Sequence, residues 1–276
     1  MKSNVISIIV TTRNEERNIR RCLQSIIKQN YKKFEIIVVD NHSTDATQKI
    51  AKVFTNKVFT YGPERSAQRN YGASKAIGEY IFFIDADMEL KNDVLASIIL
   101  YINEVKKFGG AIIPEQSVGV SFWERVKVFE RSFYLAYGDS TTDAARVFPL
   151  YLFNKNKGYD ESITGPEDWD LPERIKKNGY SIIRVPTIIF HYENIPSLKQ
   201  LLKKKYYYAL KSHRYLKKHN ISTFSSKTIY FLRPVFYKQW KAFFRHPILS
   251  TGLFIMLSGE LFAGGLGFFK GKIQNL

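Results

Sequence analysis

The sequence predicts an α/β protein with a doubly wound, mixed sheet, followed by a separate helical region. Short β-branched runs alternate with helical patterns between residues 5 and 191. The runs are apolar on both faces, which is typical of strands covered by helices on either side. Beyond Pro196 the alternation stops. We therefore expect a first domain over residues 1–195 and a basic, amphipathic to hydrophobic helical region over residues 196–276.

The first half of the expected domain alternates regularly. Strands are predicted where β-branched residues cluster, and helices where apolar residues recur every three to four positions. Ser43 is a good N-cap for the second helix. The expected elements are strands at 5–12, 34–40 and 79–84, and helices at 15–29, 43–54, 63–76 and 92–107.

The second half is less regular. Residues 138–165 are mostly polar, apart from a short segment at 146–153 and a turn at 158–160. Gly179 ends the last helix of the domain. The remaining expected elements are helices at 122–137 and 166–177, and strands at 111–114, 181–185 and 188–191. In such folds ligands bind at the carboxyl ends of the strands, where we expect the functional site.

Length and composition limit the class of protein. With 276 residues and 45% hydrophobic content, the chain can bury a full core, which excludes a disordered or fibrous protein. Cys22 is the single cysteine, so no intramolecular disulfide and no multi-cysteine metal site can form, as expected of a reducing compartment. The apolar run at the N-terminus is too short for a secretory signal, so we expect the chain to stay in the cytoplasm.

The net charge of +17 is unevenly distributed. Between Asn194 and Gly259 there are 13 Lys and Arg residues and no Asp or Glu. The segment from Asn194 onward carries +14, against +3 for the first 193 residues. This asymmetry predicts that the C-terminal region meets an anionic surface.

Asp85-Ala86-Asp87 follows a hydrophobic strand and places two carboxylates at the mouth of the sheet. Mg²⁺ or Mn²⁺ bound by one or two carboxylates completes its shell with water and substrate phosphates, which suits a nucleotide-diphosphate leaving group. A solvated turn explains the same pair equally well.

A second acidic cluster, Glu167-Asp168 with Asp170 behind it, opens a helix. The helix dipole favours carboxylates in a first turn, so a purely structural role is open here. A carboxylate beside a bound sugar can instead take the proton from an acceptor hydroxyl.

Four blocks of the sequence, taken in order, resemble glycosyltransferase family 2. They are Ile8-Ile9-Val10-Thr11-Thr12-Arg13-Asn14-Glu15-Glu16 with Cys22-Leu23-Gln24-Ser25-Ile26, then Phe34 to Asp40 with Ser43-Thr44-Asp45, then Arg69-Asn70-Tyr71-Gly72 with Asp85-Ala86-Asp87, and Gly165-Pro166-Glu167-Asp168 with Leu171, Arg174 and Gly179. The resemblance covers residues 5 to 191 and implies the nucleotide-diphospho-sugar transferase fold called GT-A.

The resemblance also implies roles for individual residues. Asp168 matches the general base, with Glu167 beside it, and Asp87 matches the ligand of a Mn²⁺ or Mg²⁺ ion, with Asp85 close by. His191 matches a histidine that some relatives have near the metal, and Arg146 is a weaker match for a diphosphate or acceptor contact. The nucleotide sugar is expected to contact Thr11, Arg13, Glu15, Asp40, Arg69 and Asp85.

The sequence departs from the family pattern in two places. Asn41 and His42 follow Asp40, where the family often has a second Asp and a Gly, which weakens the assignment of the donor base. The Gln-x-x-Arg-Trp sequence in which processive synthases resemble one another is absent from the chain. A transferase that adds one sugar at a time is therefore the better interpretation.

The C-terminal region carries two membrane signals. Residues 197–219 predict a helix in which tyrosines and lysines alternate, which suits an anionic headgroup layer or a nucleic acid. Residues 248–269 form a 22-residue run whose one charge is Glu260, long enough to cross a bilayer core of roughly 30 Å. Glu260 near its centre costs about 3 kcal/mol on insertion scales, so an interfacial or re-entrant segment is an alternative, as is a buried core helix.

We therefore expect an inverting, metal-dependent glycosyltransferase at the cytoplasmic face of the cell membrane. Its partners would be a nucleotide-diphosphate sugar, an anionic membrane surface and a membrane-held acceptor, preferably a hydroxyl of a lipid-linked saccharide, because an anionic polyprenyl phosphate needs no base. Polyprenyl phosphate is the close alternative acceptor. A non-catalytic basic module that binds nucleic acid, and a degenerate transferase that only binds nucleotide, are the rival interpretations; we expect no nucleic acid partner.

Overall fold

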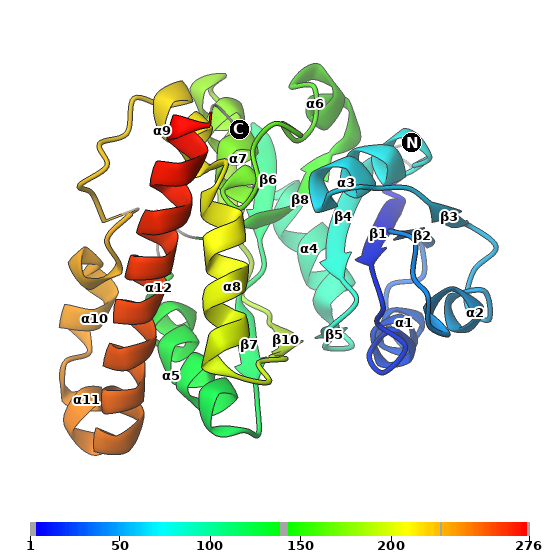
Figure 1. Cartoon of the computed structure of the whole chain (residues 1–276). Coiled ribbons are helices and arrows are strands. Elements are labelled where there is room, and N and C mark those ends of the chain that lie inside the picture. Colours follow the sequence, from blue (N-terminus) through cyan, green and yellow to red (C-terminus); the bar gives the residue numbers. More distant parts are fainter. Residues whose placement is uncertain (1–3, 139–142, 227, 275–276) are drawn as a thin grey trace. The chain divides into compact units, whose positions relative to one another are not determined.

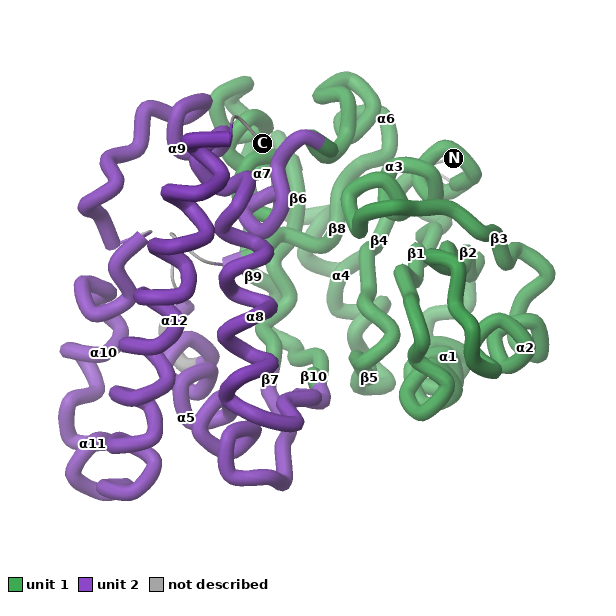
Figure 2. The backbone as a smooth tube through the Cα atoms, viewed as in Figure 1, with its two compact units in different colours: residues 1–115, 144–161, 168–191 green, residues 116–143, 162–167, 192–276 purple. Residues whose placement is uncertain are grey.

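The computed structural model describes residues 4–138, 143–226 and 228–274 (Figure 1). The chain forms two compact units, shown in different colours in Figure 2. We call Met1–Glu115, Ala144–Glu161 and Asp168–His191 the α/β unit, and Gln116–Asp143, Ser162–Glu167 and Tyr192–Leu276 the helical unit. The helical unit thus takes in residues 116–143 and 162–167, which the sequence analysis assigned to the first domain.

The α/β unit is built on a seven-stranded sheet in the order β3-β2-β1-β4-β8-β6-β9. Strands β1, β2, β3 and β4 are mutually parallel, β8 is antiparallel to both β4 and β6, and β9 is parallel to β6. The sheet is therefore mixed, as predicted. The bounds are β1 Ile6–Thr12, β2 Phe34–Asp40, β3 Val58–Thr60, β4 Tyr80–Asp85, β6 Phe108–Ile112, β8 Ala145–Pro149 and β9 Ser181–Arg184.

Helices cover both faces of this sheet. Ile8 and Val10 of β1 belong to one core cluster, whereas Ile9 between them belongs to the other, because successive side chains of a strand point to opposite faces. The first cluster includes side chains of α1 and α4, and the second includes side chains of α3, α6 and α7. The helices are α1 Ile19–Ile27, α2 Thr47–Ala51, α3 Arg65–Ser74, α4 Val94–Asn103, α6 Leu150–Lys155 and α7 Glu167–Lys177.

A second, small sheet lies next to the end of β4. Strand β5 (Met88–Leu90) pairs antiparallel with β10 (Ile189–Tyr192), and Met88 faces His191 in the register. The sequence analysis missed β5 and also β7 (Glu115–Val118). Because β5 follows Asp87 directly, its pairing with β10 brings His191 to the same place.

Two sequence predictions are wrong in detail. Ser43 does not cap a helix: α2 begins only at Thr47, and the Ser43 hydroxyl donates instead to Asp40 Oδ1 at 2.5 Å. Residues 197–219 form two helices, α8 (Leu198–Ala209) and α9 (Ser212–Lys218), and Ser197 caps the first of them.

The helical unit has its own core. Side chains of α5 (Phe122–Tyr137) pack against α10 (Pro234–Lys238), the 3₁₀ turn η1 (Tyr230–Leu232) and α12 (Pro247–Ile273). The short helix α11 (Lys241–Arg245) precedes α12. Ser121 and Glu124 form a capping box at the start of α5.

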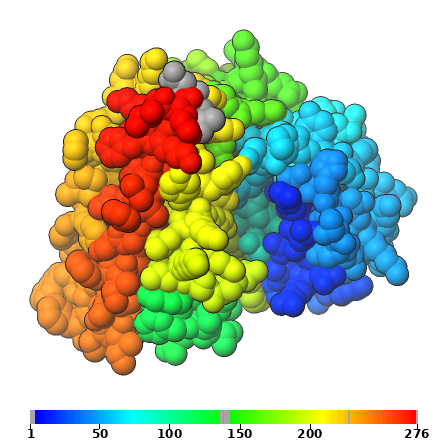
Figure 3. All heavy atoms as spheres, in the orientation of Figure 1, coloured from blue at the N-terminus to red at the C-terminus, as the bar shows by residue number. Residues whose placement is uncertain are grey.

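Helix α12 lies alongside α8, and Figure 3 shows it at the molecular surface along its length, in orange to red beside the yellow of α8. Its glycines allow a close approach: a Cβ added at Gly267 or Gly271 would overlap the carbonyl oxygens of Tyr206 and Leu210. Within the described residues, α12 is the one helix long and apolar enough to cross a membrane, with 27 residues and a mean hydropathy of 1.6.

A buried ion-pair cluster joins α12 to two neighbouring helices. Glu260 is 4% exposed, and its two carboxylate oxygens lie 3.2 Å from Lys127 Nζ of α5 and 3.7 Å from Lys205 Nζ of α8. Lys127 also pairs with Glu130 at 2.6 Å. Burial raises the pKa of Glu260, but the two lysines outweigh it and lower that pKa below its usual value. The charge predicted to oppose membrane insertion is therefore turned inward and neutralised.

Candidate active site

Asp85, the last residue of β4, is the centre of a cluster of arginines. Its Oδ1 accepts a hydrogen bond from the Thr11 hydroxyl at 2.9 Å and lies 3.3 Å from Arg69 Nη2. Its Oδ2 lies 3.5 Å from Arg65 Nη1 and 3.6 Å from Arg146 Nη1. Burial raises the pKa of Asp85, but the three guanidinium groups outweigh it and hold that pKa well below its usual range. Asp85 is therefore a fixed anion.

The sheet explains why these groups converge. Thr11 and Asp85 face each other in the parallel register of β1 and β4, so both come to the carboxyl edge of the sheet. Strand β8 runs antiparallel to β4, which places its second residue, Arg146, beside the end of β4. Arg65 and Arg69 lie one turn apart on α3.

Arg69 connects Asp85 to the predicted base. Its side chain is 1% exposed, and its Nη1 lies 2.5 Å from Asp168 Oδ1 in the first turn of α7. Burial lowers the pKa of Arg69, but the carboxylates of Asp168 and Asp85 outweigh it and raise that pKa. The guanidinium also lies 5.2 Å from the ring centroid of Tyr159, a cation–π contact. Arg69 is therefore a buried, permanently charged bridge between two carboxylates.

A second group of side chains surrounds Asp87. His191 Nε2 lies 3.4 Å from Asp87 Oδ2, and His191 Nδ1 lies 3.1 Å from Glu115 Oε2. Burial lowers the pKa of the imidazole, but its hydrogen bonds to the two carboxylates outweigh it and raise the pKa to about 10. The structure thus brings His191 to Asp87, as the sequence analysis expected.

Glu115 links the two groups of residues and was missed by the sequence analysis. Its Oε1 accepts from Arg146 Nε at 2.8 Å and from Arg146 Nη2 at 2.6 Å. One carboxylate oxygen thus accepts from both donors of one guanidinium edge, which fixes the orientation of the pair. From Asp87 through His191, Glu115 and Arg146 to Asp85, the charges therefore form one continuous network.

The Asp87 region fits a hard divalent cation. Asp87 Oδ1 is buried and has no hydrogen-bond partner in the part of the chain that the structure describes. Such an oxygen is costly to bury unless a ligand satisfies it. Among the described residues no three His, Cys, Asp or Glu side chains are grouped as a metal site. Mg²⁺ and Mn²⁺ need no such cage, because substrate phosphates and water complete their shells.

Of the residues expected to contact the base and ribose, Thr11 belongs to this network through Asp85, whereas Arg13 and Glu15 follow β1 and Asp40 ends β2. Asp40, at the end of β2, is fully buried, and its oxygens accept from the Ser43 amide at 2.8 Å and from Gln48 Nε2 at 2.7 Å. The Glu15 amide donates to the Thr47 hydroxyl at 2.7 Å, and Arg13 is exposed just past β1. These hydrogen bonds stabilise the loop that follows β1 and the loop that follows β2.

Glu167 is 2% exposed at the start of α7, whereas the side chain of Asp168 is 20% exposed. Of the two carboxylates predicted in this block, Asp168 is therefore the one within reach of solvent and joined to the arginine network. The sequence analysis overlooked Arg65 and did not identify the partners of Arg69. The four-residue spacing of the two arginines on a predicted helix could have shown that they lie on the same face.

Comparison with known proteins agrees with this fold. The model for "Glycosyl transferase family 2" matches residues 7–159, and the chain belongs to this family. The fold is GT-A: the mannosyltransferase PcManGT from Pyrobaculum calidifontis, solved in complex with GDP-Man and Mn²⁺, is similar with a TM-score of 0.60 and 19% identity, over 95% of this chain and 73% of that one.

Two curated relatives illustrate the sequence similarity. Glycosyltransferase GlyA of Streptococcus pneumoniae is 37% identical over 105 residues, which are 36% of this chain and 15% of GlyA. A dolichyl N-acetyl-α-D-glucosaminyl phosphate 3-β-D-2,3-diacetamido-2,3-dideoxy-β-D-glucuronosyltransferase of Methanococcus voltae is 28% identical over 233 residues, 72% of this chain and 70% of that enzyme. The chain therefore spans only a small part of the length of GlyA.

Proposed function

We propose that the protein is an inverting glycosyltransferase that moves one sugar from a nucleotide-diphosphate donor to a hydroxyl of a membrane-held acceptor. The observation that carries this proposal is the bridge from Asp85 through Arg69 to Asp168. It holds a partly exposed carboxylate next to the carboxyl edge of the sheet, where GT-A proteins and other doubly wound folds bind their ligands.

In the reaction the acceptor oxygen attacks the anomeric carbon while the bond from that carbon to the diphosphate oxygen breaks, with the electron pair leaving on the diphosphate. Asp168 takes the hydroxyl proton. Its Oδ1 is engaged by Arg69, so Oδ2 is the oxygen that accepts the proton. A single displacement of this kind inverts the anomeric configuration.

Asp87 and, after loss of the imidazolium proton, His191 are the residues that would hold a Mn²⁺ or Mg²⁺ ion. When bound, such an ion neutralises the charge that develops on a departing diphosphate. The same chemistry is compatible with the solved complex of PcManGT, which contains GDP-Man and Mn²⁺. Arg65 and Arg146 lie within reach of the same edge of the sheet and would contribute positive charge toward the phosphates.

A lipid-linked saccharide is the preferred acceptor. A sugar hydroxyl must lose a proton during attack, whereas a polyprenyl phosphate is already anionic, and only the first makes use of Asp168. The Methanococcus voltae relative is named as a transferase that acts on a dolichyl-phosphate-linked sugar, which supports this choice.

We further propose that α12 lies in the plane of the membrane interface instead of crossing the bilayer. One face of the helix packs against α5 and α8, and the opposite face exposes apolar side chains: Ile248, Phe254, Ile255, Leu261, Phe262, Leu266, Phe269 and Ile273. If α12 crossed the bilayer, α8, which packs along it, would have to enter the bilayer as well. The exposed Lys199, Lys203 and Lys204 of α8 would then lie in the hydrocarbon core. Each lysine at the bilayer centre costs about 2.5–3.5 kcal/mol, so the in-plane arrangement is favoured.

The charge distribution supports an anionic membrane. Glu260 is the one acidic residue from position 194 onward, and it is buried in the ion-pair cluster with Lys127 and Lys205. From residue 194 onward, the exposed lysines and arginines that the structure describes therefore have no acidic side chain of the same segment beside them at the surface. Because the cytoplasmic leaflet is the anionic one, this charge supports the proposal that the enzyme binds the cytoplasmic face of the cell membrane.

The test is sugar transfer from a panel of nucleotide sugars, with Mn²⁺, Mg²⁺ or chelator, to lipid-linked saccharides and to polyprenyl phosphate. We expect metal-dependent consumption of one donor, an inverted anomeric configuration by NMR of the product, and loss of transfer in Asp168→Asn. Glu173→Gln, on the same helix, is the matched control. Transfer to bare polyprenyl phosphate alone would overturn the acceptor assignment, and absence of both turnover and donor binding would overturn the transferase itself.

A further inference from the structure

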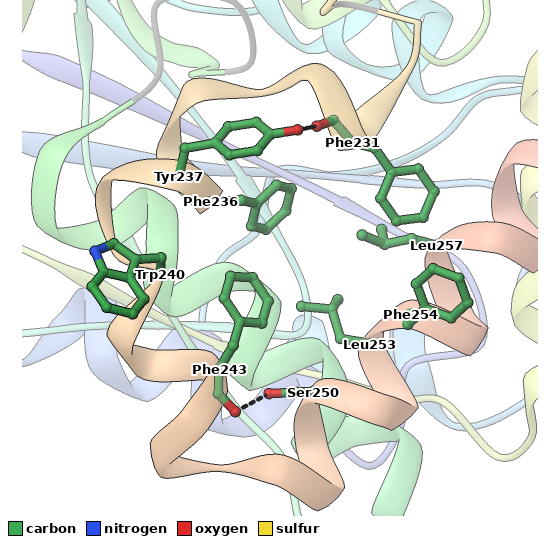
Figure 4. A pocket seen from close by; sticks show the side chains of 9 residues that line it. All are labelled: Phe231, Phe236, Tyr237, Trp240, Phe243, Ser250, Leu253, Phe254 and Leu257. Carbon is green, nitrogen blue, oxygen red and sulfur yellow. Dashed lines mark hydrogen bonds between the residues drawn. The ribbon is translucent and has the colours of Figure 1, made fainter.

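The helical unit contains an apolar pocket that the proposed sugar transfer does not use. It has a volume of about 350 Å³, within the range of roughly 300–1,000 Å³ that is typical of small-ligand sites. Segments η1, α10, α11 and α12 all contribute to it, and Figure 4 shows their side chains turned toward a common space.

The pocket has a buried floor and an exposed rim. Phe236 and Leu257 are almost fully buried, whereas Tyr237, Trp240 and Phe254 are 64%, 56% and 64% exposed. The interior is therefore reachable from the surface.

The two hydroxyl groups of the lining already have hydrogen-bond partners, and the indole N–H of Trp240 belongs to the exposed rim. The Tyr237 hydroxyl donates to the Phe231 carbonyl at 2.5 Å, and the Ser250 hydroxyl lies 2.9 Å from the Phe243 carbonyl (Figure 4). The Ser250 hydroxyl also lies 2.8 Å from the His246 carbonyl. No charged side chain lines the pocket. A ligand with polar edges, such as a nucleobase or a peptide, would leave those edges unpaired, which is costly. A hydrocarbon chain has none.

The surroundings of the rim match a membrane lipid. Phe244 and Ile248, exposed next to the pocket, continue the apolar surface along α11 and α12. Lys238, Lys241 and Arg245 are exposed on α10 and α11, and none of them forms an ion pair within the described part of the chain. An apolar opening beside unpaired cations is complementary to an anionic headgroup with a hydrocarbon tail.

We propose that this pocket takes up one acyl chain of an anionic membrane lipid, whose phosphate meets the cations of α10 and α11. Uptake of a chain fixes the protein on the bilayer more firmly than contact of a flat apolar face would. The inference rests on the proposed membrane association, but it does not depend on sugar transfer.

The test uses the full chain and vesicles of phosphatidylcholine with phosphatidylglycerol, in which a fraction of the phosphatidylglycerol carries a photoactivatable group at the end of one acyl chain. Cross-linked peptides are identified by mass spectrometry. We expect cross-links concentrated in residues 231–257. Phe254→Ala and Trp240→Ala, both exposed at the rim, should lower the yield about fivefold or more. Phe224→Ala is the matched control, because Phe224 is 83% exposed in the helical unit, lies outside α12 and does not line the pocket.

Each outcome decides a separate claim. Vesicle binding with cross-links spread evenly along α12, or unchanged by the two rim variants, would overturn the pocket and leave membrane association standing. Equal cross-linking by a neutral lipid with the same chain would overturn the role of the cations. If a tenfold smaller amount of polyprenyl phosphate displaced the lipid, the natural occupant of the pocket would be an isoprenoid chain, and the acyl-chain assignment would be overturned. Failure to bind vesicles at all would overturn both membrane proposals without affecting transfer to a soluble acceptor analogue. Thermal unfolding of each variant confirms that it is folded.

Discussion

Arg146 and Glu115 are joined by two hydrogen bonds, from Nε at 2.8 Å and from Nη2 at 2.6 Å, and both side chains are largely buried. The pair stands between the arginine cluster of Asp85 and the His191–Asp87 pair. Glu115 therefore links and positions the two groups of residues that we propose act on the donor.

Replacing Glu115 tests this link. Glu115→Ala leaves a buried arginine without its main partner, and we expect a loss of roughly 3–5 kcal/mol in the free energy of unfolding, measured by urea denaturation. Glu115→Gln keeps an acceptor oxygen and should cost less. Glu89→Ala is the control, because Glu89 pairs with Arg21 at the surface at 3.8 Å, where a pair contributes about 0–1 kcal/mol. Equal losses in Glu115→Ala and Glu89→Ala would contradict the role of Glu115.

Arg69→Lys tests the bridge. A lysine cannot hold two carboxylates with separate donors in one plane, so Asp168 should lose its fixed position and kcat should fall about 10–100-fold, with a smaller change in donor KM. Arg174→Lys is the matched control. Arg174 pairs with Asp170 at 2.8 Å on the same helix as Asp168 but outside the network. The same fall in kcat for both variants would point to general distortion of α7.

Asp87→Asn and His191→Ala test the metal site. We expect each to weaken Mn²⁺ binding by about tenfold or more, measured by electron paramagnetic resonance with a nucleoside diphosphate present. Asp168→Asn should leave Mn²⁺ binding unchanged, because Asp168 contacts Arg69 instead. Unchanged metal affinity in His191→Ala would dismiss His191 as a ligand and leave Asp87 as the candidate.

Stability should fall in acid through Glu260. The pKa of Glu260 is lowered in the folded state, so its contribution is fully present above the unfolded value of about 4.5 and is lost as the pH falls through the lower folded value. Glu260→Gln should therefore be less stable than the parent protein at pH 7, and the difference should shrink as the pH drops below about 4.5. Urea denaturation at several pH values measures this, and a difference that grows in acid would contradict it.

Membrane binding should depend on the outer face of α12. Phe262→Asp should lower binding to anionic vesicles about tenfold or more, because it puts a charge in place of an exposed apolar side chain that the membrane would bury. Raising the salt concentration should weaken the binding of the parent protein, since the headgroup attraction is screened over about 10 Å at 0.1 M. Ile77→Asp is the control, an equally exposed apolar position of the α/β unit. If the two substitutions had equal effects in a cosedimentation assay, the outer face of α12 would not be the membrane-binding surface.

The parallel core of the fold could be predicted from sequence because it depends on local patterns. Strands β1, β2 and β4 are runs rich in β-branched and aromatic residues, and the carboxyl ends of parallel strands share one edge, where the site was expected. The structure places Thr11 and Asp85 at that edge, joined by a hydrogen bond.

Other parts of the site depend on pairings that no local pattern encodes. Arg146 reaches Asp85 only because β8 runs antiparallel to β4. Glu115 and His191 are 76 residues apart in the sequence and come into contact only in the folded chain. Asp40 was placed correctly at the end of β2, but its hydrogen bonds to Ser43 and Gln48 could not be inferred from its type. For α12, composition alone left several arrangements open, and the inward position of Glu260 depends on partners in α5 and α8.

The four-residue spacing of Gly267 and Gly271 on α12 matches that of Tyr206 and Leu210 on α8, whose carbonyls they approach. Two such contacts one helical turn apart oppose both rotation of α12 about its axis and sliding by less than a turn of 5.4 Å. The same side chains must therefore always face outward. The protein presents a rigid surface whose shape is set in advance, and any partner of that surface has to adapt to it.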